Sequence, residues 1–368
     1  MPGLRTELRT ADRARLVADV VRALRAGELC ALPTETVYGL GALPSVERAR
    51  ERVRALKGRA PEHEFTLHVP DAAGAAAVAR LDDPRAQRLA ARYWPGPLTL
   101  VLPARAGGDV GLRVPAHDFT REVLQALGEP LWLTSVNRTG SPPLCDPLAI
   151  AREFGGQLAR IVDDGPSPLG TSSTVARCTG AEVEVLREGI LSRDEVLHTA
   201  AELILFVCTG NTCRSPLAAA MARREVARAL DLPDDRVLAR GLWFHSAGTA
   251  TMDGMPASEG SQLVGAELGL DLTGHRSTEL TVELARRARQ ILCLSRSHRE
   301  AVLGGAPEVQ GHTALLRPDG ADIADPYGGE VEVYRRASRE IAQAVAARVR
   351  SWLDLLPDPM PGQQRAGG

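Results

Sequence analysis

The chain has 368 residues, enough for two domains, and its 44% apolar and 24% charged residues are typical of globular domains. Its net charge of −2 excludes a protein that binds nucleic acid or anionic membranes through bulk positive charge. The apolar runs are too short to span a bilayer, and the charged N-terminus lacks the apolar core of a signal peptide. We therefore expect a cytoplasmic protein without membrane contact.

The cysteines and the lysine are informative about chemistry. The six cysteines are Cys30, Cys145, Cys178, Cys208, Cys213 and Cys293. Their scattered spacing predicts no metal site and fits a reducing compartment. Of the 44 basic residues only Lys57 is a lysine, which marks a place where a compact ammonium is not replaced by a guanidinium. The alternative is chance survival at a solvated position.

The N-terminal half alternates strands with helices without a regular order, which predicts a mixed, twisted α/β sheet. The apolar rhythm predicts helices at 12–26, 46–56, 71–81, 83–93, 118–127 and 147–154. Strands are expected at 29–32, 65–69, 93–103 after a turn, 111–115, 131–137, 161–162, 173–175 and 183–187. Between the first strand and the second helix, residues 33–41 read as a polar loop bounded by glycine.

Near residues 190–202 a short connecting helix resets the pattern, and we place domains at 1–198 and 199–357 with a flexible tail at 358–368. Strands are expected at 203–207, 242–245, 290–294 and 313–316. Helices are expected at 216–230, 256–268, 281–288, 297–303 and 331–356. This alternation predicts a doubly wound parallel sheet, which binds ligands at the carboxyl ends of its strands.

The segment LILFVCTGNTCRSP at 203–216 combines a buried strand, a tight loop and a helix that Pro216 opens. Such a loop gathers backbone N–H groups and a helix N-terminus around one point, which makes an anion-binding nest. The amides and Arg214 would stabilise a thiolate on Cys208, and the Arg214 fork matches two phosphate oxygens. The segment therefore predicts a nucleophile and a phosphate receptor; the alternative is a structural cysteine after a core strand.

This segment resembles the Cys-x5-Arg-Ser-Pro loop of the low-molecular-weight phosphotyrosine phosphatase family. The resemblance implies that Cys208 attacks phosphorus, that Arg214 binds phosphoryl oxygens and that Asp325, in an Asp-Pro-Tyr sequence, is the general acid. Asp-Pro is otherwise a common turn. The phosphate-binding loop would comprise Thr209, Gly210, Asn211, Thr212, Cys213 and Ser215. Ser215 would hydrogen-bond the sulfur, Asn211 would hold the loop, and no cofactor is implied.

Other features of the second half leave alternatives open. Cys213 has two possible roles. By resemblance to the family it would form a reversible disulfide with the nucleophile, and the alternative is that it is only a small packed side chain. The HSAGT and GHRS segments, which contain His245 and His275, look structural. Tyrosine-directed enzymes of the family carry a larger aliphatic residue at the position of Thr212. The threonine here resembles the loop of bacterial protein-arginine phosphatases. We therefore favour phosphoarginine over phosphotyrosine, and Tyr327 would stack on either group.

The first half carries an ordered set of short motifs between residues 33 and 189. In chain order they read PTETVYGLG, KGR, WPGPLT, LRVP, LTSVNRTG, GTSSTV and LREG. Together they resemble the YrdC-like threonylcarbamoyl-AMP synthase family over about residues 10–192. The resemblance implies that L-threonine, bicarbonate and ATP, with Mg2+, form threonylcarbamoyl-adenylate and pyrophosphate, a step that links the protein to threonylcarbamoyladenosine modification of tRNA.

The same resemblance implies two groups of binding residues. ATP would contact Lys57, Arg59, Ser135, Asn137 and Arg187. Threonine would contact Thr34, Thr36, His68, Arg113 and Ser173. Singly, each is an ordinary polar residue at a surface or strand end. The chain also departs from the family pattern Lys-x-Arg-Pro-x-x-Lys-Pro-Leu, because His63 replaces the second lysine and both prolines are displaced.

These departures leave two functions open. The chain is a bifunctional synthase and phosphatase, or it is a phosphatase whose N-terminal half is a non-catalytic module that binds nucleotide or RNA. Survival of Lys57 favours some retained anion binding. The partners expected are L-threonine, bicarbonate, ATP and a phosphoprotein, with an indirect link to tRNA modification enzymes.

Overall fold

The computed structural model describes residues 4–8, 12–58, 65–138 and 140–357. It divides the chain into two compact units between Ala200 and Ala201, and each unit is described by itself. The predicted flexible tail and Arg59, which was predicted to contact ATP, lie outside the described residues. No helix in the described ranges combines the length and the apolar character needed to cross a membrane.

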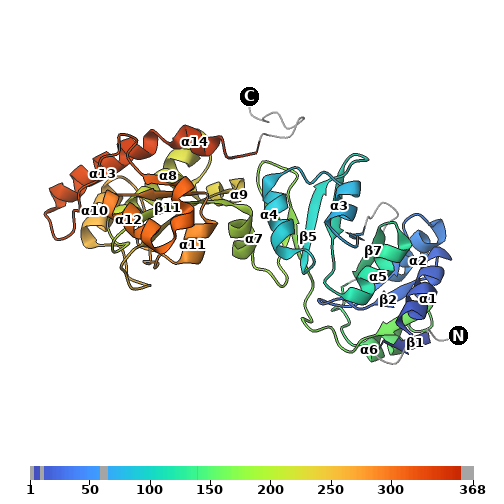
Figure 1. The fold of residues 1–368 in the computed structure, drawn as a ribbon. Helices are drawn as coiled ribbons and strands as arrows, with labels where there is room; N and C mark the ends of the chain where they lie inside the picture. The colour runs from blue at the N-terminus through green and yellow to red at the C-terminus, as the bar shows by residue number, and fades with distance from the viewer. Residues whose placement is uncertain (1–3, 9–11, 59–64, 139, 358–368) are drawn as a thin grey trace. The chain divides into compact units, whose positions relative to one another are not determined.

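The first unit is built on one ten-stranded sheet with the order β1-β8-β2-β3-β7-β4-β6-β5-β9-β10 (Figure 1). Its strands are β1 (Leu4–Glu7), β2 (Cys30–Leu32), β3 (Gly39–Ala42), β4 (Leu67–His68), β5 (Leu98–Pro103), β6 (Asp109–Arg113), β7 (Leu131–Ser135), β8 (Arg160–Asp163), β9 (Thr174–Arg177) and β10 (Glu184–Arg187). Its helices are α1 (Arg13–Arg25), α2 (Glu47–Lys57), α3 (Ala72–Val78), α4 (Pro84–Tyr93), α5 (Asp118–Leu127), α6 (Pro147–Phe154) and α7 (Arg193–Ala200). Parallel and antiparallel pairs occur together, so the predicted mixed sheet is confirmed.

Alternation along the central strands gives this sheet two buried faces. Cys30 and Leu32 pack with α1 and α5, whereas Leu29 and Ala31 pack with α2 and α6. The loop predicted at 33–41 is shorter than expected, because β3 begins at Gly39 and pairs antiparallel with both β2 and β7. A side-chain carbon at Gly39 would lie 2.0 Å from a Leu133 methyl group, so any larger residue here requires Leu133 to move.

The second unit has a four-stranded sheet with the order β12-β11-β13-β14, and every pair in it is parallel. Its strands are β11 (Glu202–Cys208), β12 (Leu242–Gly248), β13 (Gln290–Cys293) and β14 (Thr313–Leu315). Its helices are α8 (Arg214–Ala229), α9 (Val237–Arg240), α10 (Glu259–Glu267), α11 (Val282–Arg287), α12 (Arg296–Gly305), α13 (Val331–Ala346) and α14 (Val349–Leu353), with 3-10 turns η1 (Asp234–Arg236) and η2 (Pro307–His312).

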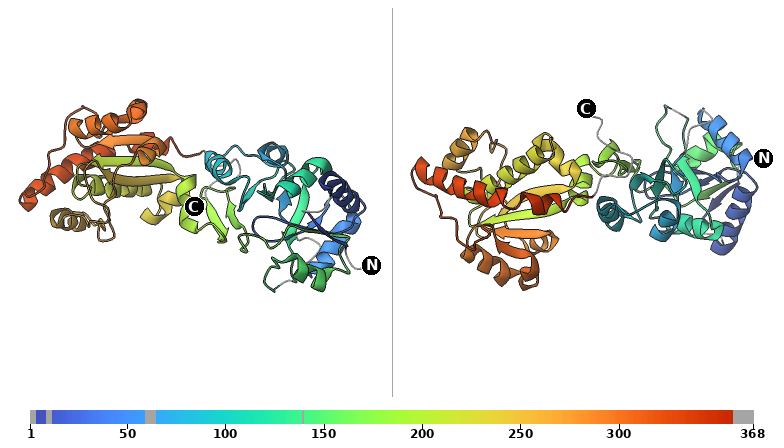
Figure 2. Two further views of the ribbon diagram at one scale, coloured as in Figure 1. Left: turned by 60° about the horizontal axis from the view of Figure 1, so that its bottom comes forward. Right: turned by 90° about the horizontal axis from the view of Figure 1, so that it is seen from above.

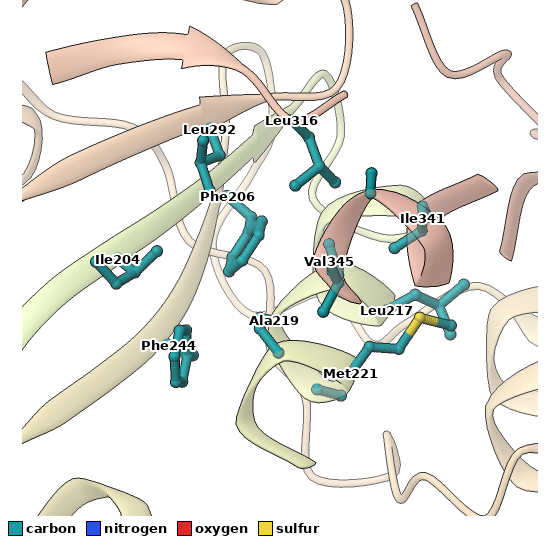
Figure 3. Close-up of a cluster of buried hydrophobic side chains, with 14 of the residues drawn as sticks. Ile204, Phe206, Leu217, Ala219, Met221, Phe244, Leu292, Leu316, Ile341 and Val345 are labelled. Atoms are coloured by element: carbon teal, nitrogen blue, oxygen red, sulfur yellow. The ribbon is translucent and has the colours of Figure 1, made fainter. Parts of the chain in front are cut away.

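Helices cover both faces of this sheet, as the views in Figure 2 show, and the doubly wound prediction is confirmed. Ile204 and Phe206 on β11 pack against α8, α13 and α14, which form the larger core (Figure 3). Leu203 and Leu205 point to the opposite face and pack against α11 and α12. Burial on both faces explains the continuous apolar run in the sequence.

Several helix boundaries differ from the predictions by one to three residues, and two differences have a physical reason. Helix α8 begins at Arg214 instead of Pro216. The third residue of a helix has no intrahelical N–H partner to lose, so proline is accepted there without cost. The long C-terminal helix predicted at 331–356 is interrupted after Ala346, and a second helix begins at Val349.

Candidate active sites

The strand–loop–helix of the second unit places Cys208 at the carboxyl end of β11, where ligands bind in doubly wound sheets. Cys208 is 2% exposed, and its Sγ lies 2.9 Å from Ser215 Oγ on the first turn of α8. The carbonyls that follow the strand are held by the next loop, because Thr249 N–H donates to Cys208 O and Ala250 N–H to Thr209 O. The nucleophile predicted from sequence therefore sits in a fixed loop with a hydroxyl against its sulfur.

Asn211 shapes this loop from its centre. Its φ of 52° lies in the left-handed region that asparagine tolerates better than most residues. Its Nδ2 donates to Ser215 Oγ at 2.9 Å and to Ser246 Oγ at 2.8 Å, and its Oδ1 accepts from Thr278 N–H at 2.8 Å. His275 Nε2 lies 2.7 Å from the Asn211 carbonyl oxygen. A buried polar network thus fixes the backbone of this loop at its centre.

Arg214 is 5% exposed and crosses from the loop to the segment after β14. Its Nη1 donates to Ile323 O at 3.0 Å and its Nη2 to Asp325 Oδ2 at 2.7 Å. Its Nε is buried and has no hydrogen-bond partner among the described residues. An unmet buried N–H is costly, and because Arg214 lines the cavity this donor is available to a ligand that enters it.

These groups surround a cavity of about 320 Å³. Its lining residues are Cys208, Thr209, Gly210, Thr212, Cys213, Arg214, Asp325 and Tyr327. The Asp325 side chain is 51% exposed at the rim, and Tyr327 beside it is 77% exposed. The structure therefore collects around one cavity the predicted nucleophile, arginine, acid and most of the predicted loop, while Asn211 and Ser215 support it from behind.

The remaining predicted residues of this unit lie close by. Cys213 is buried, its thiol donates to Ser258 Oγ at 3.2 Å, and Tyr334 Oη is 3.9 Å from its sulfur. His245 stacks on Trp243 with ring centroids 4.9 Å apart, away from the cavity lining. Burial lowers the pKa of His275, so its ring is neutral while it donates to the loop.

His298 is a residue of this site that sequence reasoning missed. It lies on α12, is 4% exposed, and its Nε2 is 2.9 Å from Thr209 Oγ1. Burial, with Arg214 adding to it, lowers the pKa of His298 to about 4. The signal was available, because His298 follows the carboxyl end of β13, the strand beside β11.

In the first unit a polar cavity of about 110 Å³ lies among β3, β5, β6, β7 and the residues before β9. Six predicted residues line it: Thr34, His68, Arg113, Ser135, Ser173 and Arg187. Sequence reasoning missed the lining residues Tyr38, Thr66, Thr99, Thr134 and Ser172. Thr36, Lys57 and Asn137 were predicted here but lie behind the lining, held by contacts to it.

Arg113 is the buried cation of this cavity, at 5% exposure. Its Nη2 donates to Glu35 Oε1 at 2.6 Å and to Thr36 Oγ1 at 2.9 Å, and its Nε donates to Gly96 O at 3.0 Å. Thr34 Oγ1 lies 2.9 Å from Thr36 Oγ1. Glu35 was not predicted. Its carboxylate pairs with the Arg113 guanidinium in the way that the carboxylate of a ligand would.

Lys57 is 4% exposed at the end of α2 and reaches the turn after β7. Its Nζ donates to Ser135 O and Asn137 O at 3.0 Å each and to Asn137 Oδ1 at 2.6 Å. Ser135 Oγ also donates to Asn137 Oδ1 at 2.6 Å. Three acceptors match the three ammonium donors, so Lys57 must exchange an acceptor before it binds a phosphate.

The opposite wall is made of residues before and after β9. Ser173 Oγ is 3.0 Å from Thr99 Oγ1, and Arg187 Nη2 donates to Ser173 O at 2.7 Å. Burial, with Arg113 adding to it, lowers the pKa of His68 to about 3 and also lowers the pKa of Arg187. With a neutral imidazole, the charged groups at this cavity are the guanidinium groups of Arg113 and Arg187 and the Glu35 carboxylate that pairs with Arg113.

The family resemblance of this unit also implied Mg2+. The described residues contain no cluster of three or more His, Cys, Asp or Glu side chains suited to a metal ion. They therefore do not form a protein cage for the ion.

The fold and the two sites define a protein of two α/β units, one with a cysteine-bearing loop at a strand end and one with an arginine-lined polar pocket in a mixed sheet. Residues 22–189 match the Sua5, YciO and YrdC family, described as "Telomere recombination", and residues 203–356 match the family "Low molecular weight phosphotyrosine protein phosphatase". The chain belongs to both of these families, in that order along the sequence.

Three relatives illustrate the match. A threonylcarbamoyl-AMP synthase of Pyrococcus abyssi is 34% identical over 49% of this chain and 56% of its own length, so the chain spans about half of that protein. A threonylcarbamoyl-AMP synthase of Nitrosococcus oceani is 36% identical over 45% of this chain and 96% of its own length. A protein-arginine-phosphatase of Geobacillus stearothermophilus is 38% identical over 38% of this chain and 87% of its own length.

Proposed function

We propose that the second unit is a cysteine-dependent phosphoprotein phosphatase. The observation that carries this proposal is the 2.9 Å contact between Cys208 Sγ and Ser215 Oγ at the floor of a cavity that Arg214 and Asp325 close. A serine hydroxyl in contact with the sulfur and the N-terminus of α8 beside it both favour a thiolate over a thiol. The histidine of this site, His298, contacts Thr209, so Cys208 depends on that environment to be reactive at neutral pH.

The reaction follows from the roles of the groups around the cavity. Cys208 forms a bond to phosphorus as the bond to the leaving group breaks, and Asp325 gives the leaving group a proton. Asp325 then takes a proton from water, which attacks phosphorus and releases Cys208. Arg214 exchanges Asp325 for phosphoryl oxygens when substrate enters, and its unpaired Nε gains an acceptor at the same time.

The substrate we propose is phosphoarginine. Thr212 contributes a hydroxyl to the cavity wall, and the relative from Geobacillus stearothermophilus is named as an arginine phosphatase. A short polar wall suits a planar guanidinium better than a phenol ring. Hydrolysis of phosphoarginine and phosphotyrosine by wild type and by Thr212→Ile tests the choice. A wild-type preference for phosphotyrosine would overturn it.

Cys208→Ser tests the mechanism itself. We expect phosphatase turnover to fall by at least about 10⁴-fold, because the hydroxyl is a far weaker nucleophile at this position. Binding of inorganic phosphate, measured by calorimetry, should persist because Arg214 and the amides remain. Turnover near the wild-type rate in this variant would remove Cys208 from the mechanism.

For the first unit we propose threonylcarbamoyl-AMP synthesis from L-threonine, bicarbonate and ATP. The supporting observation is that six residues implied by the family resemblance, distant in sequence, line one polar cavity. Arg113 would bind the threonine carboxylate in place of Glu35. Lys57 would give up one of its present acceptors, such as Asn137 Oδ1, and donate to an ATP phosphate instead. The product would supply the modification of adenosine in tRNA.

A non-catalytic nucleotide- or RNA-binding role remains the rival for this unit, because His63 replaces a family lysine and Lys57 is fully engaged. One assay separates the two. The synthase predicts pyrophosphate release from ATP that requires both threonine and bicarbonate. Nucleotide binding by the intact chain without such release would favour the rival.

A further inference from the structure

A chain of hydrogen bonds connects the first loop residue after the nucleophile to the N-terminus of α12. Thr209 Oγ1 lies 2.9 Å from His298 Nε2, and His298 Nδ1 lies 2.8 Å from Ser295 Oγ. Ser295 Oγ is in turn 2.8 Å from Ser297 Oγ and accepts from His298 N–H at 3.4 Å. The imidazole is therefore held at both nitrogens, and it fixes the rotamer of Thr209.

The hydroxyl of Thr209 keeps bonding capacity for a ligand. The lowered pKa of His298 makes its ring neutral at pH 7, so one nitrogen donates and the other accepts. If Thr209 donates to the ring, its oxygen retains two lone pairs; if it accepts from the ring, one lone pair remains. Thr209 is an exposed residue of the cavity lining, so its hydroxyl keeps an acceptor site for a ligand in either case.

Three polar side chains interrupt a cavity lining that is otherwise mostly apolar. Thr209, Thr212 and Asp325 together offer two hydroxyl oxygens and a carboxylate. A guanidinium carries N–H donors in one plane and keeps them after the P–N bond breaks. An aryl phosphate carries no donor at the corresponding atoms, so it gains nothing from an acceptor there.

We propose that Thr209 is a specificity-determining residue that accepts a hydrogen bond from the guanidinium of phosphoarginine, and that His298 is the positioning residue that aims its hydroxyl. This assignment rests on the phosphatase function proposed above. It concerns the leaving group only, and it adds a second hydroxyl to the wall that Thr212 forms. The bond must be aimed to be selective, because a freely rotating hydroxyl would also turn toward solvent.

The experiment compares kcat/KM for free phosphoarginine with kcat/KM for p-nitrophenyl phosphate in the full chain. Thr209→Val removes the hydroxyl with little change of shape, and we expect the ratio of the two constants to fall about tenfold. His298→Ala should lower the ratio by a similar factor, and Thr209→Ser should restore most of it. Because His298 acts through Thr209, the double variant should lie no lower than Thr209→Val alone.

Several results would contradict the assignment. Equal losses of kcat/KM on both substrates would mean that Thr209 and His298 only support the loop. If the two single-variant reductions of the ratio multiplied in the double variant, His298 would act separately from Thr209, for example on Arg214. His298→Gln, which can keep a bond to Thr209, distinguishes a lost contact from a lost fold. Wild type that hydrolyses neither compound would overturn the phosphatase itself, whereas active enzyme with an unchanged ratio in Thr209→Val would overturn this assignment alone.

Discussion

The two candidate sites are assembled in opposite ways. The loop at the site of the second unit comes from one stretch at residues 208–215, supported by Asp325 and His298 from elsewhere. The cavity of the first unit draws on residues between Thr34 and Arg187, spread over most strands of a ten-stranded sheet. One site is fixed mainly by local backbone curvature, and the other exists only when the whole sheet has formed.

The cations differ in the same way. In the first unit Lys57 and Arg113 are bound to the chain's own oxygens, so a ligand has to displace Asn137 or Glu35 groups. In the second unit Arg214 also pairs with Asp325, but its buried Nε has no partner among the described residues. A loop with an unmet donor is prepared for an anion, whereas a satisfied pocket must rearrange first. The following predictions test this difference.

Arg214→Lys should produce the largest effect. An ammonium cannot supply the planar pair of donors or the buried Nε, so we expect phosphatase kcat/KM to fall about 10³-fold, or about 4 kcal/mol of transition-state stabilisation. The matched control is Arg228→Lys on the same helix, where the side chain is 70% exposed. A fall of less than tenfold in Arg214→Lys would show that the loop amides bind the phosphoryl group unaided.

Lys57→Met should act on stability. It leaves the carbonyls of Ser135 and Asn137 without their donor, and we expect the first unit to lose about 3 kcal/mol of unfolding free energy. Hydrogen exchange of peptides from α2 and β7 in urea measures this loss. Arg48→Met on the same helix, whose side chain is 64% exposed, should change stability little. Unchanged stability with lost pyrophosphate release would instead show an ammonium already available to phosphate.

Arg113→Lys should weaken threonine use. We expect kcat/KM for threonine in pyrophosphate release to fall about 10²-fold, since a single ammonium does not match a carboxylate in the way a guanidinium does. Glu35 would then be left with a poorer partner inside the unit. Arg177→Lys on β9, 41% exposed and paired with Glu184, is the control that should keep the wild-type value. An unchanged KM for threonine would move the carboxylate site elsewhere.

The buried imidazoles give the smallest predicted effect, through pH. His68 has its pKa lowered to about 3 from its usual 6.5 by burial, so between these values the unfolded chain holds a proton that the folded unit rejects. Stability must therefore fall as pH drops, by about 2 kcal/mol between pH 7 and pH 5 from this group. His68→Phe should remove that part of the pH dependence.

Hydrogen exchange at pH 7 and pH 5 measures this effect in each unit separately. His298 serves as the internal comparison, because its pKa is also lowered, to about 4, and the His68 variant leaves it untouched. Peptides of the second unit should therefore keep their acid sensitivity. If the His68 variant destabilised the first unit equally at both pH values, the proton linkage would be absent and only packing would have changed.

The sequence by itself determined much of this protein. Periodicity gave both sheet types and nearly all helices, because burial of one helix face or both strand faces is written in local patterns. The loop at Cys208 was also predictable, since its donors, its nucleophile and its arginine lie within eight residues and share one curved backbone. Strand β3 was missed because its first residue is Gly39, and glycine has a low strand propensity. The glycine is there because the strand packs closely against Leu133.

Only the tertiary structure decided which polar residues meet. The pairing of Glu35 with Arg113, the clamp of Lys57 on the turn after β7 and the reach of His298 to Thr209 join residues 78, 80 and 89 positions apart. No local pattern encodes such contacts, because a polar side chain at a strand end looks the same whether it faces water, a ligand or a neighbour. Sheet order and burial make that choice, and with it they set which donors stay unmet for a ligand.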